Sequence, residues 1–345
     1  MTIDEAITTV ADHESKIKEV PASADLKIVD GDTLVIQDSR FRLRDAGFGR
    51  FCEQVSAPAG YMRDLPGRVR QPVLQHHLDC CDSGPDRLTV ISRDGQFLAF
   101  GRPELMRISG QDVLEAVQAG ADCDPDVHHF EISDESFRAD LLVESATAEA
   151  ARGDVLRAGV TVRHSLIGDH ATQIESFIFR LVCRNGMTHR DCVGSRAART
   201  RRLPSDHHDA RKMQIEQVRR LTADVVAKLH EKLNAISGLR RDQVDVDRLM
   251  TRFLERGGMS TRQWLPVLRG AWEMEGSEPT AFGVMNAMTR IATHGMENMV
   301  GREDQVISPR HRRILGGLAG ILAFQQVHIC PRCFSTLRGV ANENN

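Results

Sequence analysis

The sequence is poor in aromatic residues and in long apolar runs. Aromatic residues make up 5% of the 345 residues, with one Tyr and two Trp. This scarcity argues against a surface built from many base-stacking rings. No run approaches the roughly 18 apolar residues that a membrane-spanning helix needs, and the first 20 residues include no apolar signal-peptide core. We therefore expect a cytoplasmic protein with no membrane partner.

The motifs of several common enzyme classes are also missing. The chain has no Gly-x-x-x-x-Gly-Lys-Ser/Thr loop, no dinucleotide-binding glycine fingerprint after a strand, no His-Glu-x-x-His and no Gly-x-Ser-x-Gly. These absences weigh against ATP-driven and common hydrolytic enzymes. They favour a binding protein over an enzyme and leave an unfamiliar enzyme open.

The composition is that of a globular protein. Hydrophobic residues make up 41% and charged residues 27% of the chain. The eight cysteines are scattered, apart from Cys80-Cys81 and Cys330-x-x-Cys333. In a reducing cytosol we expect most of them to be free, buried thiols.

The pattern predicts an α+β fold, with a hairpin-rich antiparallel sheet core followed by a C-terminal helical region. Residues 26–37 alternate around an Asp-Gly pair, and residues 88–100 flank Asp94-Gly95, so both stretches predict hairpins. Strands are expected at 137–146, 158–165 and 173–183, the last two joined by a turn.

Helices are expected elsewhere in the chain. Residues 41–78 read as short helices broken at Pro58, Pro66 and Pro72, and a helix opens at Ser109 or Gln111. The acidic stretch 122–134 reads as an exposed loop. Helical spacing of apolar residues then follows at 209–236, 244–257, 261–275, 280–299 and 309–326, with Thr261 and Thr280 as N-caps or first-turn residues.

These elements suggest four segments. Residues 1–35 form an N-terminal arm, whose amphipathic helix lacks strong caps, and residues 36–204 form the mixed core. Residues 205–327 form the helical region, and residues 328–345 form a tail with the Cys-x-x-Cys pair.

The net charge of -3 hides an asymmetry along the chain. Residues 1–160 hold 17 Lys+Arg and 29 Asp+Glu, whereas residues 161–345 hold 28 and 19. Residues 180–220 hold 11 Lys+Arg against four acids. A local positive field of this kind attracts phosphates even on a slightly acidic protein.

The stretch FRLVCRNGMTHRDC, Phe179 to Cys192, combines a strand with several chemical groups. Asn185-Gly186 predicts a turn, because both residues tolerate positive φ. The turn could simply reverse the chain, or its backbone N–H groups could bind an anion beside the flanking basic residues. A Cys183–His189 nucleophile pair is a third reading, but it would need contact in space and an orienting group.

Arginines follow this stretch, in a segment that precedes Pro204. Arginine forks suit phosphate oxygens, although a solvated charged loop is an equal reading. The sequence hypothesis is therefore a protein that binds nucleic acid, with DNA favoured, in single-strand binding or annealing. The expected contact residues are Arg163, Arg180, Arg184, Asn185, Gly186, His189, Arg190, Arg196, Arg199, Arg201 and Arg202.

Two groups of residues suggest metals. His328, Cys330 and Cys333 form half of a zinc site, which would need a fourth ligand. Asp206-His207-His208-Asp209 has the look of a phosphoesterase signature, but it follows no buried strand, and Ser205 or Asp206 reads better as a helix N-cap. A metal-dependent nuclease or phosphoesterase would draw on His164, His170, His189, Asp191, His207 and His208.

The order of features resembles the phage/plasmid-like proteins, a family with a domain of unknown function found on phages, plasmids and integrated elements. The shared residues are Tyr61–Pro66, the hairpin 88–100, Gly159–Gly168, Phe179–Met187 with its Arg-x-x-Cys-x-Asn-Gly-Met, and Asn286–Arg290. The resemblance covers roughly residues 35–325. It implies a mobile-element protein that acts near DNA replication, recombination or defence, and it implies no reaction. A protein-interaction module and a homo-oligomer stay open as alternatives.

Overall fold

The structure is a computed structural model, and it describes residues 1–21, 26–80, 88–101, 108–151, 154–180, 185–188, 207–295 and 307–324. The chain divides into two compact units. The first takes its residues from 1–139, 162–174 and 196–222, and the second from 140–161, 175–195 and 223–345. Because each unit combines separate stretches of chain, the four expected segments stay predictions.

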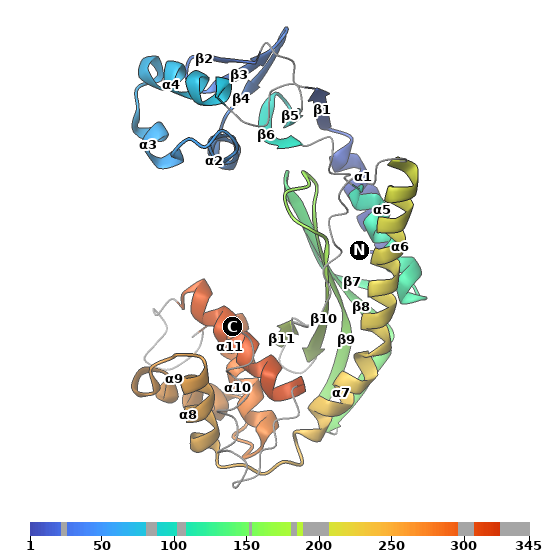
Figure 1. Ribbon diagram of the computed structural model, residues 1–345. Helices are drawn as coiled ribbons and strands as arrows, with labels where there is room; N and C mark the ends of the chain where they lie inside the picture. Colours follow the sequence, from blue (N-terminus) through green and yellow to red (C-terminus); the bar gives the residue numbers. More distant parts are fainter. Residues whose placement is uncertain are drawn as a thin grey trace. The chain divides into compact units, whose positions relative to one another are not determined.

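The first unit contains a six-stranded sheet with the order β1-β5-β6-β4-β3-β2 (Figure 1). All neighbours are antiparallel except β4 and β6, which pair in parallel. Both expected hairpins are confirmed, as β2–β3 and β5–β6, and Asp94 and Gly95 turn the second with φ of 49° and 73°. The strands are β1 (Ile17–Pro21), β2 (Lys27–Val29), β3 (Thr33–Ile36), β4 (Ser39–Arg42), β5 (Thr89–Arg93) and β6 (Gln96–Gly101).

Three helices pack with this sheet around an apolar core (Figure 1). They are α2 (Asp45–Gln54), α3 (Ala59–Asp64) and α4 (Gly67–Asp79). The expected break at Pro72 is wrong, because α4 runs through it. Proline removes only the hydrogen bond to the Arg68 carbonyl, and the buried Leu74 and Leu78 hold the helix on the core.

Two capped helices complete the N-terminal part of the first unit. Helix α1 (Ile3–Glu14) contacts α5 (Gly110–Ala121). Ser109 caps α5 as expected, whereas the expected lack of a cap on α1 is wrong, because Thr2 and Glu5 form a capping box there. Strand β1 then pairs with β5, so residues of the expected N-terminal arm belong to the sheet.

The second sheet has the order β11-β10-β9-β8-β7. The expected loop at 122–134 is wrong over most of its length, since β7 occupies Asp126–Ile132 as an edge strand, which needs only one half-buried face. At Gly159 a Cβ atom would lie 2.0 Å from the Leu141 carbonyl oxygen, so only glycine allows this close approach. The other strands are β8 (Ser136–Ala151), β9 (Asp154–Ser165), β10 (Gln173–Arg180) and β11 (Asn185–Thr188).

The turn expected at Asn185-Gly186 is wrong. Both residues belong to β11, where Gly186 pairs with Phe179 and Asn185 with Arg180. Because the backbone of Asn185 and Gly186 takes part in a strand pair, it does not form the expected turn of N–H groups.

Helices dominate the C-terminal part, which confirms the α+β class. Helix α10 is buried along nearly its whole length and contacts α8, α9, α11 and β11, while Thr280 caps its start. The helices are α6 (His207–Ala227), α7 (Leu229–Gly238), α8 (Val246–Arg256), α9 (Thr261–Met274), α10 (Ala281–His294) and α11 (Pro309–Phe324). Within the described residues, no helix combines the length and apolar character needed to cross a membrane.

Candidate anion-binding pocket

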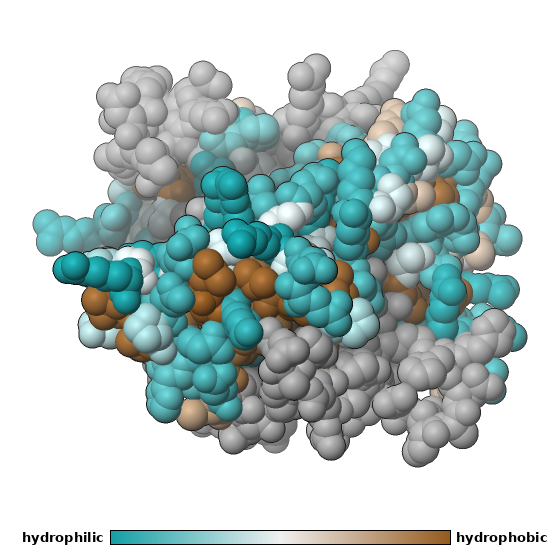
Figure 2. Space-filling model, turned by 90° about the horizontal axis from the view of Figure 1, so that it is seen from above, coloured by the Kyte–Doolittle hydropathy of each residue, from teal (hydrophilic) through white to brown (hydrophobic). Residues whose placement is uncertain are grey.

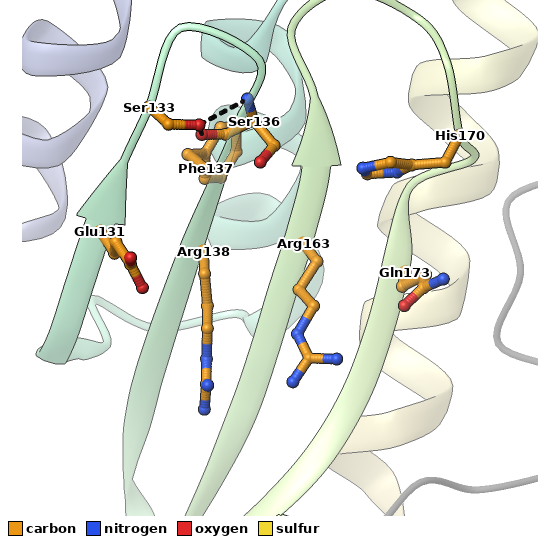
Figure 3. Close-up of a pocket in the computed structure, with 8 residues that line it drawn as sticks. All are labelled: Glu131, Ser133, Ser136, Phe137, Arg138, Arg163, His170 and Gln173. Atoms are coloured by element: carbon orange, nitrogen blue, oxygen red, sulfur yellow. Dashed lines mark hydrogen bonds between the residues drawn. The ribbon is translucent and has the colours of Figure 1, made fainter. Parts of the chain in front are cut away.

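A pocket of about 350 Å³ opens on the second sheet, within the first unit. Its walls come from the end of β7, the start of β8, the end of β9 and the turn that leads into β10 (Figure 3). Most of the side chains are polar. The lining residues are Glu131, Ser133, Ser136, Phe137, Arg138, Arg163, His170 and Gln173.

Strand alternation places two arginines in this pocket. Phe137 and Ala139 on β8 are buried, and so are Val162 and His164 on β9. Side chains alternate across a strand, so Arg138 and Arg163, each between two buried neighbours, point to the opposite face. We call Arg138 and Arg163 the pocket arginines.

The pocket arginines run side by side in the same direction, from neighbouring strands (Figure 3). Neighbouring strands lie about 4.8 Å apart, so the two side chains bring two positive charges into one pocket. An anion that reaches both guanidinium groups would accept hydrogen bonds from both. Phosphate and carboxylate groups have the geometry for such a contact.

A rigid turn forms the rim at the β7–β8 end. The Ser133 hydroxyl oxygen accepts from the backbone N–H groups of Glu135 and Ser136, at 3.3 and 3.2 Å, and donates to the Ser136 carbonyl at 3.1 Å. Arg50 anchors the same turn from α2, through a 2.8 Å ion pair with Glu135. The rim is therefore held in place independently of any ligand.

Asp134, which follows Ser133 in this turn, lies among charged groups. Arg93 forms an ion pair with Asp134, and His13 Nε2 lies 2.7 Å from the Arg93 guanidinium. Burial lowers the pKa of His13, and the positive charge of Arg93 lowers it further against the opposing effect of Asp134. His13 is therefore held toward its neutral form beside the rim.

The far side of the pocket mixes polar groups of different charge. His170 and Gln173 lie on the turn into β10 and at its first residue. Glu131 is the acidic residue among the lining side chains, and it lies 3.9 Å from His129, outside the lining. The arrangement can bind an anion by charge and offer amide and imidazole groups to its neighbouring atoms.

His164 plays a structural role behind the pocket. The buried ring contacts the Thr172 hydroxyl at 2.9 Å and the Ile108 carbonyl oxygen at 3.2 Å, so each ring nitrogen has a partner. It is therefore not available as the metal ligand of the nuclease hypothesis. In the part of the chain that the structure describes, no three His, Cys, Asp or Glu side chains form a group that could hold a metal ion.

Only some of the expected contact residues lie in described regions. Arg163 lies in the pocket, while Arg180, Asn185 and Gly186 are described by their backbone in β10 and β11. Of the nuclease candidates, His170 lines the pocket, and the backbone of His207 and His208 lies in α6. Outside the described residues lie Cys183, Arg184, His189, Arg190, Asp191, Arg196, Arg199, Arg201, Arg202, His328, Cys330 and Cys333.

Arg138 and Gln173 were not among the residues predicted from the sequence, and His170 was predicted only as a metal ligand. The alternation that placed Arg163 opposite the buried Val162 and His164 applies equally to Arg138, between Phe137 and Ala139. The alternation of side chains along β8 could therefore have shown that Arg138 lies on the same kind of face as Arg163. The sequence does not show that β8 pairs with β9, and this pairing brings the two arginines together.

A family model matches part of the chain, and this part includes one of the two pocket arginines. Residues 143–314 match a family model described as a domain of unknown function (DUF932). This family match includes Arg163, His170 and Gln173 and begins after Arg138. No curated protein and no solved structure matches the chain.

Proposed function

We propose that the protein binds nucleic acid, with DNA favoured, and that the pocket arginines contact the phosphate backbone. The observation that carries the proposal is the placement of two guanidinium groups side by side on neighbouring strands, in a pocket with a rigid rim. The positive charge of residues 180–220 supports it, because this field would draw a polyanion toward the protein. The resemblance noted in the sequence extends the proposal to a mobile-element protein in replication or recombination.

Phosphate contacts fit the proposal better than base readout does. Phe137, the one Phe, Tyr or Trp that lines the described pocket, is buried, so it offers no platform for base stacking. Contacts would therefore go mainly to phosphates, and affinity would depend weakly on sequence and strongly on salt.

Titration of a labelled single-stranded oligonucleotide, followed by fluorescence anisotropy, tests the proposal. Replacing both arginines in an Arg138→Gln/Arg163→Gln variant should weaken binding. It should also flatten the dependence of log K on log salt by about 1.4, since each contact to a single strand contributes about 0.7. The control variant Arg241→Gln/Arg262→Gln removes two exposed arginines outside residues 180–220 and should bind as the unchanged protein does.

Two results would count against the proposal. One is no binding of the unchanged protein at low salt. The other is equal binding by the pocket variant and the control, with the pocket variant still folded by circular dichroism. The same protein incubated with Mg²⁺ or Mn²⁺ tests the nuclease alternative, because strand cleavage would replace simple binding as the proposed activity.

A further inference from the structure

A second positively charged surface lies on the first sheet. Residues 40–44 read Arg-Phe-Arg-Leu-Arg, in which Phe41 and Leu43 are buried at 5% and 3% exposure. Arg40, Arg42 and Arg44 between and beside them are exposed. We call these three residues the arginine ladder.

Extended backbone puts the ladder on one face. Arg40 and Arg42 belong to β4, and Arg44 continues the extended path with φ of -123° and ψ of 151°. Residues two apart on a strand point the same way and lie about 6.6 Å apart. Phe41 and Leu43 pack in the core beneath, so the three arginines share the open face.

The neighbouring strands extend this face without covering it. In the ladder's register Arg40 pairs with Val35 and Arg42 with Thr33, and Val35 pairs in turn with Lys27 on β2. Lys27 is exposed, so it adds a fourth cation to the same face. Among the described residues, no ion pair involves Lys27 or any arginine of the ladder.

The other half of the same sheet is covered. Ile91 on β5 and Leu98 and Ala99 on β6 form an apolar cluster with Ile167 from the β9–β10 turn. Chain therefore covers one part of the sheet and leaves the part with the cations exposed. Figure 2 shows one face of the molecule, on which hydrophilic residues predominate and apolar residues lie among them.

We propose that the arginine ladder, with Lys27, is a second contact surface for the phosphate backbone of a single nucleic-acid strand. The proposal rests on the proposed nucleic-acid binding and adds a surface to it. A straight row of evenly spaced arginines complements the repeating charges of one extended strand, and the guanidinium fork suits phosphate oxygens. Among the described side chains, the exposed acidic residues next to the face, Asp32, Asp38 and Asp94, lie in turns rather than in the row itself.

Among the described residues this face has no aromatic side chain, because its other members are Val29, Thr33, Val35 and Gln96. These residues offer no base stacking, so the binding that the face supplies should be independent of sequence. These features favour the backbone of a nucleic acid over the bases as the recognised part.

The test compares two triple variants of the full-length protein. Arg40→Gln/Arg42→Gln/Arg44→Gln removes the ladder, and Arg241→Gln/Arg262→Gln/Arg310→Gln removes three exposed arginines elsewhere. Loss of three contacts to a single strand should flatten the salt slope by about 2.1. Between about 50 and 200 mM salt, the fall in affinity should then shrink by a factor of roughly 18, whereas the control should keep the original slope.

Four probes separate the kinds of partner: a single-stranded oligonucleotide, its duplex, poly-glutamate, and vesicles that contain an anionic phospholipid. A selective loss of single-strand binding supports the proposal. Equal losses in both triple variants would show a general charge effect and overturn it, and so would a loss confined to poly-glutamate, vesicles or duplex. The Arg138→Gln/Arg163→Gln variant in parallel separates the two surfaces. If only the ladder variant weakens binding, the ladder stands and the pocket contact fails; if only the pocket variant does, the ladder proposal fails.

Discussion

The pocket arginines and the arginine ladder present the same chemical group in different surroundings. Arg138 and Arg163 are half-buried, lie on two neighbouring strands and share a pocket with His170, Gln173 and a glutamate. The ladder lies along one extended segment, on an open face with three exposed arginines in a row. A pocket can fix the position and orientation of one anionic group, whereas a row of arginines can contact several charges along a polyanion.

This difference has a physical basis in what supports each surface. Salt bridges and hydrogen bonds hold the pocket rim, from Arg50 to Glu135 and through the Ser133 hydroxyl. The ladder is held by the pairing of β4 with β3 and β6 and by the apolar packing of Phe41 and Leu43 beneath it, without a salt bridge of its own among the described residues. The pocket should therefore be sensitive to geometry and protonation, and the ladder to the integrity of the core.

The largest effect should follow removal of the core beneath the ladder. Phe41→Ala deletes a buried ring from the first sheet, and such deletions cost about 3–5 kcal/mol in the free energy of unfolding. Urea denaturation measures the loss. Tyr61→Ala removes a ring that is 61% exposed and should cost less than about 0.5 kcal/mol. An equal loss in both variants would mean that the Phe41 ring contributes no more to the stability of the fold than an exposed ring does.

Local signals in the sequence predicted the parts of this fold that depend on few residues. Asp94-Gly95 correctly predicted the β5–β6 hairpin, and Ser109 and Thr280 correctly predicted the starts of two helices. Turns and helix caps depend on the backbone of these residues and on close neighbours in the sequence. The helix break predicted at Pro72 was wrong, because burial of one face of α4 outweighs one lost hydrogen bond. The loop predicted over β7 was wrong, because an edge strand forms by pairing with its neighbour, here β8, even when its composition is acidic.

The two surfaces were predictable to different degrees. Arg163 was expected to contact nucleic acid, but its partner Arg138 could be found only from the order of strands, which depends on contacts far apart in sequence. The ladder has a visible signal in Arg-Phe-Arg-Leu-Arg, a period-two pattern typical of a strand. The prolines that follow it favoured a helical reading of the whole stretch 41–78, so the strand was missed.

The second prediction separates geometry from charge. Arg163→Lys keeps the charge of a pocket arginine but removes its planar fork, so affinity for a single strand should fall about tenfold, or about 1.4 kcal/mol. Arg42→Lys on the open ladder should change affinity less than about twofold. No neighbouring side chain among the described residues orients the Arg42 fork there, so the charge of a lysine should make a similar contact with a phosphate. Anisotropy titrations at one salt concentration compare the two. Equal losses would show that the two surfaces make the same kind of contact.

The third prediction concerns pH, and it applies to the pocket side alone. The pKa of His13 is lowered in the folded protein, so its stabilising contribution is complete above the unfolded value of about 6.5 and is lost as pH falls through the folded value. Melting temperature should therefore drop between neutral and mildly acidic pH, and His13→Gln should reduce the drop. The control His128→Gln changes an exposed histidine on β7 and should leave the drop as it is. A drop that is the same in all three proteins would assign the effect to other groups.

The smallest effect concerns the stability of the open face. Arg42→Gln removes an exposed side chain with no ion pair among the described residues, so the free energy of unfolding should change by less than about 0.5 kcal/mol. Arg50→Gln is the matched change at the pocket rim, where the side chain binds Glu135 and the Leu98 carbonyl, and it should cost more, about 1–3 kcal/mol. Urea denaturation of both variants measures the difference. A marked loss in Arg42→Gln would mean that the Arg42 side chain stabilises the first sheet, which would count against a role of the ladder in binding a ligand.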